Sequence, residues 1–519
     1  MKNRNAKGVV AAGSLPTAQA GIEILRQGGN AIDAAVASAF AVSAGEPTVT
    51  SLGGAGIMMI YRADSETLEV CDFFANAPRM KTSEQPNLDF FGIDLDYGPT
   101  QQTFYAGRGS AAVPGVIPGL GTVHEKYGHL SFSDLLMPAI RQLEEGVELG
   151  PRQCAMCEFL EPILTRESVP KRWYSPNGTY LSNSGQFSLP ELAHTLRQMQ
   201  AVGWRPYYEN VLVPEMLDAF GPHKGGLLTS RDFEDYAPIF RSPIQTELFG
   251  HQVYTVPSPA AGGPMIALML NLLNHRALQS KSSDALASAF AAALETADES
   301  RMRNVSGQPL LSNTDLDAKF NARLTQLSGQ ETAPGGPPST THISVVDGDG
   351  NAVALTLSHG ESNAYNIGNT GIMMNNFLGE SDLLPQGFGT AETGVRLATM
   401  MSPTIAIGSN GEIIALGTGG ANRIRSAILQ CLWHLIAAQS TPRAAIDAPR
   451  LHYENGDLNL ETFGRRKNLN TFIESIPNTV TLFTEPNLYF GGINCAVRDG
   501  AGVLDGAGDP RRGGVSLFA

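Results

Sequence analysis

The sequence has 519 residues, of which 42% are hydrophobic and 17% are charged, so it can bury a large core and is not typical of a disordered or fibrous chain. Its 50 acidic residues outnumber its 36 basic ones and give a formal charge of −14, which argues against nucleic acid or an anionic membrane surface as a partner. We expect small molecules as ligands instead.

No apolar run approaches the ~18 residues that a membrane helix needs. The apolar run near the N-terminus, residues 9–12, is too short for a signal peptide, so we expect a cytoplasmic protein, or a periplasmic one if the sequence lacks a leader. The five cysteines are an odd number, scattered along the chain, which argues against a disulfide framework. Cys154 and Cys157 could be a redox pair, but without a second such pair we interpret them as helix-packing residues.

The N-terminal region predicts two helices and a hairpin. Ser14 can cap the first helix and Gly28 can end it, and the Ala-rich residues 32–43 predict a second helix that is buried on most faces. Residues 51–64 then predict a glycine turn followed by a buried strand. Residues 68–78 supply the expected hairpin partner of that strand.

The middle of the chain predicts mostly helices. We expect helices over residues 118–127 and 131–145, and a mainly helical region from 150 to 330. Within it, residues 288–304 predict a helix and residues 251–256 predict a strand.

The segment 331–340, "ETAPGGPPST", contains three prolines and two glycines, which predicts an extended, exposed loop. A period-two pattern follows and predicts a hairpin with its turn at "DGDGN", residues 347–351. Further strands and one helix are expected at 371–376, 402–408, 412–417 and 422–439. Strands with helices on either side indicate a layered α/β arrangement.

Hydroxyl residues stand where the loop meets the hairpin. If the hairpin is symmetric about Asp349, Ser358 lies opposite Thr340. A threonine hydroxyl is a poor nucleophile without a base, but a cut between Ser339 and Thr340 would free an α-amine with a pKa of about 8 on the same residue. The Ser358 hydroxyl could then orient the Thr340 oxygen. The alternative is that Thr340 and Thr341 are ordinary strand-forming residues.

An acyl-transfer site also needs donors for a negative oxygen. "GTGGANRI" lies between a predicted strand and a predicted helix, so Gly419, Gly420 and Ala421 place main-chain N–H groups at a helix N-terminus. Such a turn also suits phosphate. Neither a Walker lysine nor GxGxxG follows, however, so a nucleotide site is disfavoured.

Several motifs in order resemble the γ-glutamyltransferase (γ-glutamyl transpeptidase, glutathione hydrolase) family. They are "ILRQGGNAIDAAVASAFAVSAGEP", "SLGGAGIMMIY", "VPGVIPGL", "TTHISVVDGDGNAVALT", "GIMMNN", "MSPTI", "GTGGANRI", "APRLH" and "GAGDPRR". The resemblance implies an N-terminal-nucleophile hydrolase, an αββα sandwich that cleaves itself before the nucleophile. It further implies Thr340 as nucleophile and base, Ser358 as the family's second threonine, and Gly420 with Ala421 as the oxyanion-hole pair.

The same resemblance implies a division of the chain into a helix-rich large subunit, residues 1–339, and a small subunit, residues 340–519, that carries the nucleophile. The two fragments should stay together as a heterodimer, which could assemble further. No cofactor and no metal are expected, because no metal-ligand spacing is present. His342 and His359 flank the site; without a GxSxG motif, we interpret His342 as a structural strand residue.

The sequence departs from the family at the glutamate-binding residues. Phe74 stands where the family has the arginine that binds the α-carboxylate of a γ-glutamyl group. Glu380 stands where the family often has the aspartate that binds the α-ammonium. Thr399 and Met400 replace paired serines.

The family's substrate asparagine falls near Gly360 or Glu361, in a loop that is about two residues shorter. Arg79, Arg108 or Arg423 could supply the missing cation, although each is more often a surface or structural residue.

Three functions follow from these residues. The first is hydrolysis or transfer of a γ-glutamyl amide such as glutathione through a Thr340 acyl-enzyme. The second keeps the nucleophile but acts on a dicarboxylic or aliphatic amide, as cephalosporin acylase-type relatives do. The third is an unprocessed, non-catalytic binding protein.

Overall fold

The computed structural model describes residues 3–96, 101–178, 181, 185–274, 283–306, 308–327, 339–384, 386–463 and 470–519. Residues 331–338 of the proline-rich segment lie outside these ranges, so the exposed loop expected there stays a prediction. Within the described ranges, no helix is both long and apolar enough to cross a membrane.

Two antiparallel sheets form the centre of the molecule. The first has seven strands in the order β22 (Val515–Phe518), β1 (Gly8–Ala12), β11 (Thr341–Asp347), β12 (Ala352–Ser358), β2 (Ala55–Arg62), β3 (Thr67–Phe73) and β8 (Ile239–Arg241). The second has six strands in the order β21 (Leu504–Gly508), β20 (Asn494–Arg498), β16 (Ile413–Gly417), β15 (Thr404–Gly408), β10 (His251–Thr255) and β9 (Ile244–Leu248). The expected hairpin of β2 with β3 is present.

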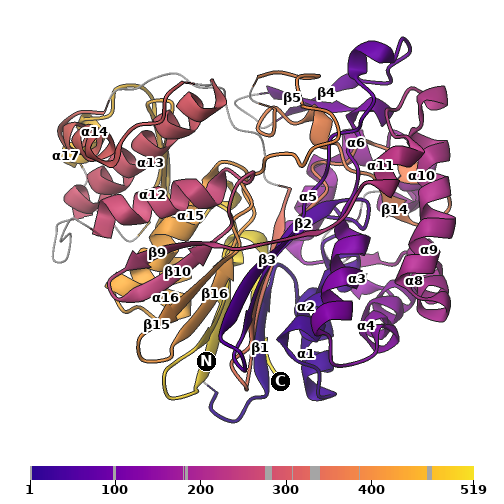
Figure 1. Ribbon diagram of the computed structural model, residues 1–519, viewed down its shortest axis with the longest axis horizontal. Coiled ribbons are helices and arrows are strands. Elements are labelled where there is room, and N and C mark those ends of the chain that lie inside the picture. Colours follow the sequence, from indigo (N-terminus) through magenta and orange to yellow (C-terminus); the bar gives the residue numbers. More distant parts are fainter. Residues whose placement is uncertain are drawn as a thin grey trace.

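The two sheets pack face to face, with β11 against β16 and β20. Buried apolar side chains from both sheets fill the space between them, among them Val346, Ile57, Ile405 and Ala415. Helices cover both outer faces, α1 and α2 on the first sheet and α12 and α15 on the second (Figure 1). These layers confirm the predicted αββα sandwich.

The first helical layer begins as the sequence predicts. Helix α1 (Leu15–Arg26) is capped by the Ser14 hydroxyl, which accepts from the Thr17 main-chain N–H, and it ends just before Gly28. Helix α2 (Ala31–Gly45) is buried along its whole length, as expected of an apolar, Ala-rich segment between a sheet and other helices. The other helices of residues 1–234 are α3 (Val116–Tyr127), α4 (Phe132–Glu145), α5 (Pro151–Phe159), α6 (Glu161–Leu164), α7 (Ser168–Tyr174), α8 (Pro190–Val202), α9 (Trp204–Tyr207), α10 (Val213–Phe220) and α11 (Ser230–Glu234).

The second helical layer lies at the left of Figure 1, with α12 (Gly262–Asn274), α13 (Ser283–Val305), α14 (Asn313–Thr325), α15 (Arg423–Leu432), α16 (Pro442–Asp447) and α17 (Asn470–Glu474). Short sheets complete the fold, namely β4 (Phe91–Asp96) with β5 (Gln101–Ala106), β6 (Val147–Glu148) with β7 (Gln186–Phe187), β13 (Asn366–Ile367) with β14 (Ile372–Met373), and β17 (Leu451–Glu454) with β18 (Asp457–Glu461) and β19 (Val480–Phe483).

One predicted strand is shorter in the structure than the sequence indicates, and the predicted cysteine pair lies on a helix. The strand expected over residues 371–376 is limited to Ile372–Met373, because Asn375 turns inward. The side-chain amide of Asn375 donates to the carbonyls of Gly53 and Ala112. Neither residue belongs to β13, the strand that pairs with β14. Cys154 and Cys157 lie buried on α5, which agrees with their interpretation as packing residues.

Each large sheet contains strands from both sides of the predicted cut. In the first sheet, β11 and β12 lie between β1 and β2 of the N-terminal part. In the second sheet, β10 pairs with β15 across the same division, and β9 pairs with β10. The predicted fragments are therefore interleaved within both sheets.

Candidate active site

Thr340 lies directly before β11, at the end of a central strand of the first sheet. The register of β11 with β12 pairs Thr341 with Leu357 and His342 with Thr356, which is the symmetry predicted for the hairpin. Ser358, the last residue of β12, is therefore brought to the strand end at which Thr340 stands.

Two side chains, those of Ser358 and Glu361, form hydrogen bonds with Ser339, the residue before the predicted cleavage site. The Ser358 hydroxyl donates to the Ser339 carbonyl and accepts from the Gly360 N–H at 3.0 Å. The Ser339 hydroxyl donates to Oε1 of Glu361 at 2.9 Å. In the uncleaved chain the Ser358 hydroxyl therefore points to the Ser339 carbonyl, not to the Thr340 oxygen that we expected it to orient.

A cavity next to Thr340 brings together most of the predicted site residues. We call it the Phe74 cavity, and it is lined by Phe74, Ser339, Thr340, Ser358, Phe377, Glu380, Asp382, Leu383, Thr399, Met400, Met401, Ala421 and Ile424. Gly360, Glu361 and Gly420 lie nearby but do not line it. The ring of Phe74 packs on that of Phe377, with centroids 4.9 Å apart, so one wall is aromatic.

Carboxyl groups gather at this cavity. Glu380 is half-buried, but its Oε1 atom is buried and has no hydrogen-bond partner within the described part of the chain. Burial and the nearby carboxyls of Glu361 and Asp382 raise the pKa of Glu380 well above its ordinary value. Burial also raises the pKa of Glu361 to about 7, although hydrogen bonds from Ser339 and Asn376 oppose this shift.

The three arginines considered for the missing cation are engaged elsewhere. Arg79 forms an ion pair with Asp235. Arg108 forms an ion pair with Asp89 at 3.2 Å and lies over the Tyr365 ring. Arg423 donates to a main-chain carbonyl at 3.3 Å and lies over the ring of Tyr489. None of the three lines the Phe74 cavity.

The glycine-rich turn expected to hold an oxyanion lies between β16 and α15. Gly420 has φ 138° and Ala421 has φ 48°, so Ala421 occupies the left-handed region that non-glycine residues rarely adopt. Ala421 lines the Phe74 cavity, whereas Gly419 packs directly against the Thr340 carbonyl. The turn thus approaches Thr340 from the second sheet while Ser358 approaches from the first.

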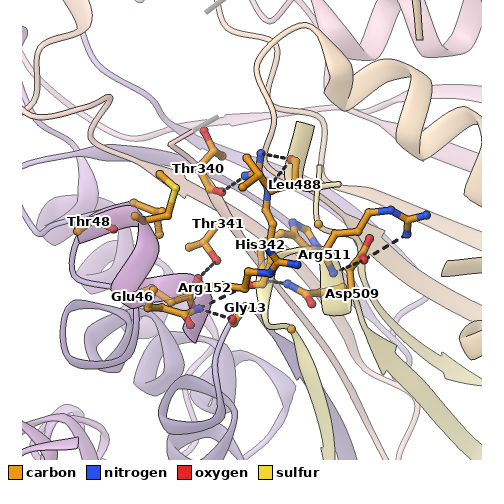
Figure 2. A pocket seen from close by; sticks show the side chains of 17 residues that line it. Gly13, Glu46, Thr48, Arg152, Thr340, Thr341, His342, Leu488, Asp509 and Arg511 are labelled. Carbon is orange, nitrogen blue, oxygen red and sulfur yellow. Dashed lines mark hydrogen bonds and ion pairs between the residues drawn. The ribbon is translucent and has the colours of Figure 1, made fainter. Parts of the chain in front are cut away.

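Thr340 also lines a second cavity (Figure 2). We call it the Glu46 cavity, and it is lined by Gly13, Glu46, Thr48, Val49, Arg152, Gln153, Met156, Thr340, Thr341, His342, Leu488, Gly492, Asn494, Asp509, Arg511, Arg512 and Gly514. Within it, the Thr341 hydroxyl donates to Oε2 of Glu46, and the Thr17 hydroxyl donates to Oε1 at 3.0 Å. Burial raises the pKa of Glu46, although these hydrogen bonds lower it.

Arg512 contacts the predicted nucleophile from this second cavity. Its Nη1 donates to the Thr340 carbonyl at 3.3 Å, and its Nε donates to the Leu488 carbonyl at 3.4 Å. Burial and the neighbouring Arg423 lower the pKa of Arg512 to about 9. Arg512 and Glu46 were missed as site residues, although both stand inside motifs, "GAGDPRR" and "SAGEP", that carried the family resemblance.

Two histidines flank the site and are held neutral. His342 is buried in β11 with its ring nitrogens 2.9 Å from the hydroxyls of Thr356 and Ser344. Burial lowers its pKa to about 3, and burial lowers that of His359 to about 4. These contacts agree with a structural role for His342. No group of metal-ligating side chains is found in the ranges that the structure covers.

The chain is similar in sequence and in structure to known proteins. The profile of the family described as gamma-glutamyltranspeptidase matches residues 17–519. The glutathione hydrolase proenzyme of Escherichia coli is 26% identical over 484 residues, covering 87% of this chain and 82% of the relative. The acylase ACY 1 proenzyme of Pseudomonas sp. strain SE83 is 29% identical over 543 residues, covering 98% and 93%. The crystal structure of cephalosporin acylase from Bacillus halodurans superposes with a TM-score of 0.82 at 23% identity, covering 100% and 96%.

The αββα layers and the similarity to the acylase structure define the fold of an N-terminal-nucleophile hydrolase. Within that class, the chain belongs to the gamma-glutamyltranspeptidase family, because the family profile matches it from residue 17 to its last residue. It is a γ-glutamyltransferase-like enzyme, and several of its relatives are named as proenzymes.

Proposed function

We propose that the protein is a self-cleaving threonine hydrolase or acyltransferase that cleaves small amides through an acyl-enzyme on Thr340. The observation that carries this proposal is the position of Thr340 at the end of β11, between the Ser358 hydroxyl, the Gly419–Ala421 turn and the Phe74 cavity.

Self-cleavage begins when the Thr340 hydroxyl attacks the Ser339 carbonyl carbon. The carbonyl oxygen becomes negative, and the Ser358 hydroxyl already donates to that oxygen. The C–N bond breaks, the Thr340 nitrogen takes the hydroxyl proton, and an ester joins the two residues. Water then hydrolyses the ester, which leaves a carboxylate on Ser339 and a free amine and hydroxyl on Thr340.

Turnover repeats the same chemistry on a substrate. The free amine of Thr340 accepts the proton of its own hydroxyl, and the oxygen attacks the carbonyl carbon of the bound amide. The amide C–N bond breaks, the leaving amine takes the proton, and the acyl group stays on Thr340 as an ester. Water or a second amine then accepts the acyl group.

The first candidate substrate is a γ-glutamyl amide such as glutathione, which the names of several relatives support. The second is a non-glutamyl amide, which the name of the acylase relative supports. A specific observation favours the second candidate, because no Lys or Arg lines the described wall of the Phe74 cavity to bind the α-carboxylate of glutamate.

A denaturing gel and intact mass spectrometry test the proposal. Self-cleavage before Thr340 predicts fragments of about 36 and 19 kDa, scaled by length from 55.2 kDa. Thr340→Ala should give one uncleaved chain without amidase activity. An uninterrupted wild-type chain that still hydrolyses amides would overturn the proposal, and a persistent, inactive single chain would favour the non-catalytic binding protein.

A further inference from the structure

The Glu46 cavity is too small for an amide substrate but large enough for water. Its volume is about 40 Å³, whereas one internal water molecule needs about 10–15 Å³. Exposed Arg152 and half-buried Met156 belong to its lining, so its outer end lies close to the protein surface. The cavity can therefore hold no more than a few water molecules, which can exchange with the solvent.

Two lining side chains carry buried polar atoms that no described residue satisfies. These atoms are Oγ1 of Thr48 and Oδ1 of Asn494. The Asn494 side-chain nitrogen donates to the His342 carbonyl at 2.7 Å, which fixes the orientation of the amide and leaves Oδ1 as an acceptor. The Glu46 carboxyl supplies further acceptor sites. Because internal water commonly satisfies buried polar atoms that lack protein partners, these groups indicate a water site.

Thr340 separates this cavity from the Phe74 cavity. Among the described lining residues, it is the only one that the two cavities share. Its carbonyl accepts from Arg512, a lining residue of the Glu46 cavity, so the main chain of Thr340 lies at this cavity (Figure 2). After cleavage, the free amine and the acylated oxygen would both belong to Thr340. A water molecule that reaches the amine from the Glu46 cavity would therefore lie within reach of the ester carbon.

We propose that the water molecule that hydrolyses the ester on Thr340 is bound in the Glu46 cavity, with Thr48 and Asn494 as its positioning residues. This inference rests on the proposed Thr340 chemistry and assigns the route by which one reactant enters. The water oxygen attacks the ester carbon while the Thr340 amine takes the water proton. The bond between that carbon and Oγ1 breaks, Oγ1 takes the proton from the amine, and the carboxylic acid leaves.

Transfer to an amine would follow a different route. A peptide amine is larger than the few water molecules that about 40 Å³ can hold, so it would approach Thr340 from the Phe74 cavity. Hydrolysis and transfer would then depend on different residues, and a substitution in the Glu46 cavity could slow the first without slowing the second.

The ratio of hydrolysis to transfer tests this separation. Acyl-enzyme formed from γ-glutamyl- or butanoyl-p-nitroanilide is divided between water, which gives the free acid, and glycylglycine, which gives the acyl dipeptide. This ratio depends on how the acyl-enzyme is consumed and not on how fast it forms. Thr48→Val should lower the ratio of acid to dipeptide by about fivefold or more, because the water loses one hydrogen bond. Thr48→Ser retains the hydroxyl and should keep a ratio close to that of wild type.

Thr50→Val is the matched control. The Thr50 hydroxyl is also buried and has no partner within the described ranges, but Thr50 does not line the cavity, so the ratio should stay unchanged. Intact mass spectrometry of acid-quenched turnover without glycylglycine gives a second readout. The fraction of small subunit that carries the acyl group should rise in Thr48→Val and not in Thr50→Val. Thermal denaturation reports the folding of each variant, and Thr48→Ala replaces Thr48→Val if the valine variant does not fold.

Each outcome has one meaning. An acid-to-dipeptide ratio that does not fall and an acylated fraction that does not rise in Thr48→Val would overturn the inference while leaving the proposed chemistry intact. An equal fall of the ratio in Thr50→Val would also overturn it, because that residue does not line the cavity. Failure of cleaved wild-type protein to release p-nitroaniline from either anilide would count against the proposed function itself, and the inference would fall with it.

Discussion

The guanidinium of Arg512 donates to the main-chain carbonyl of Thr340 at 3.3 Å. This contact holds the residue that would become the first of the small subunit, and Arg512 lines the Glu46 cavity and not the Phe74 cavity that would bind substrate. It also places a cation a few ångströms from the nitrogen that would be the catalytic base. A like charge nearby disfavours an ammonium, so Arg512 should keep that amine deprotonated at neutral pH.

Arg512→Met should therefore shift the rising limb of the kcat/KM–pH profile to higher pH by about one unit, because removal of the cation raises the pKa of the Thr340 amine. Arg512→Lys retains the charge and should shift it less. Arg152→Gln removes an exposed cation of the same cavity and is the control. An unchanged limb in Arg512→Met, with kcat lowered equally at every pH, would assign Arg512 a purely structural role.

Ser358→Ala should slow self-cleavage by about 10²- to 10³-fold, because it removes the hydroxyl that donates to the carbonyl oxygen of Ser339. Ser358→Thr retains the hydroxyl and should process far faster than the alanine variant. The measurement is the time course of fragment appearance on a denaturing gel. Equal rates for the alanine variant and wild type would show that this hydrogen bond does not contribute to cleavage.

Gly419→Ala should reduce both processing and turnover by about tenfold or more, because a Cβ atom on Gly419 would lie 1.9 Å from the Thr340 carbonyl oxygen. A displacement of that carbonyl moves the nucleophile itself. Gly150→Ala is a suitable control, since its added Cβ would contact only the side-chain oxygen of Gln153, at 2.9 Å. Thermal denaturation should show that both variants remain folded.

The buried carboxyl of Glu361 should make stability depend on pH. Its folded-state pKa is raised to about 7 by burial, against about 4.5 when exposed, so its contribution is fully present below pH 4.5 and is lost as pH rises through 7. Glu361→Gln in the uncleavable Thr340→Ala background should therefore raise Tm more at pH 8 than at pH 5. A Tm difference that is equal at both values would contradict this assignment.

Arg425 should hold the two predicted subunits together. It is fully buried and lies 2.9 Å from carboxylate oxygens of Asp298 and of Glu454, which stand on opposite sides of the predicted cut. Arg425→Met removes the guanidinium partner of both carboxylates and should lower the free energy of unfolding by about 3–5 kcal/mol, measured by urea denaturation. Arg197→Met breaks an exposed ion pair and should change it little.

The sequence predicted those parts of the site that are local along the chain. The hairpin register that brings Ser358 to Thr340 follows from a symmetric turn at Asp349, and the burial of α2 follows from its alanine-rich composition. Each depends on contacts between residues close in sequence. The family resemblance supplied the layered fold, and Glu380 and Thr399, which that resemblance predicts as substrate-binding residues, both line the Phe74 cavity.

Contacts between distant residues could not be predicted in this way. Glu46 reaches Thr341 across 295 positions, and Arg512 reaches Thr340 across 172, and no local periodicity encodes either approach. The Ser358 contact was predicted in part, because the register identified its neighbour but not which oxygen its hydroxyl would bind. The Ser358 hydroxyl binds the Ser339 carbonyl because Ser339 is still joined to Thr340 in this structure.

The interleaving of strands has a consequence for biosynthesis. Because β11 and β12 are inserted between β1 and β2, neither piece of the proposed pair could assemble a complete sheet by itself. Two separately translated halves would each expose unpaired strand edges, which invite aggregation. If the proposed cleavage occurs, the peptide bond before Thr340 would serve as a temporary tether during folding, and its severance should come only once the architecture that severs it has been completed.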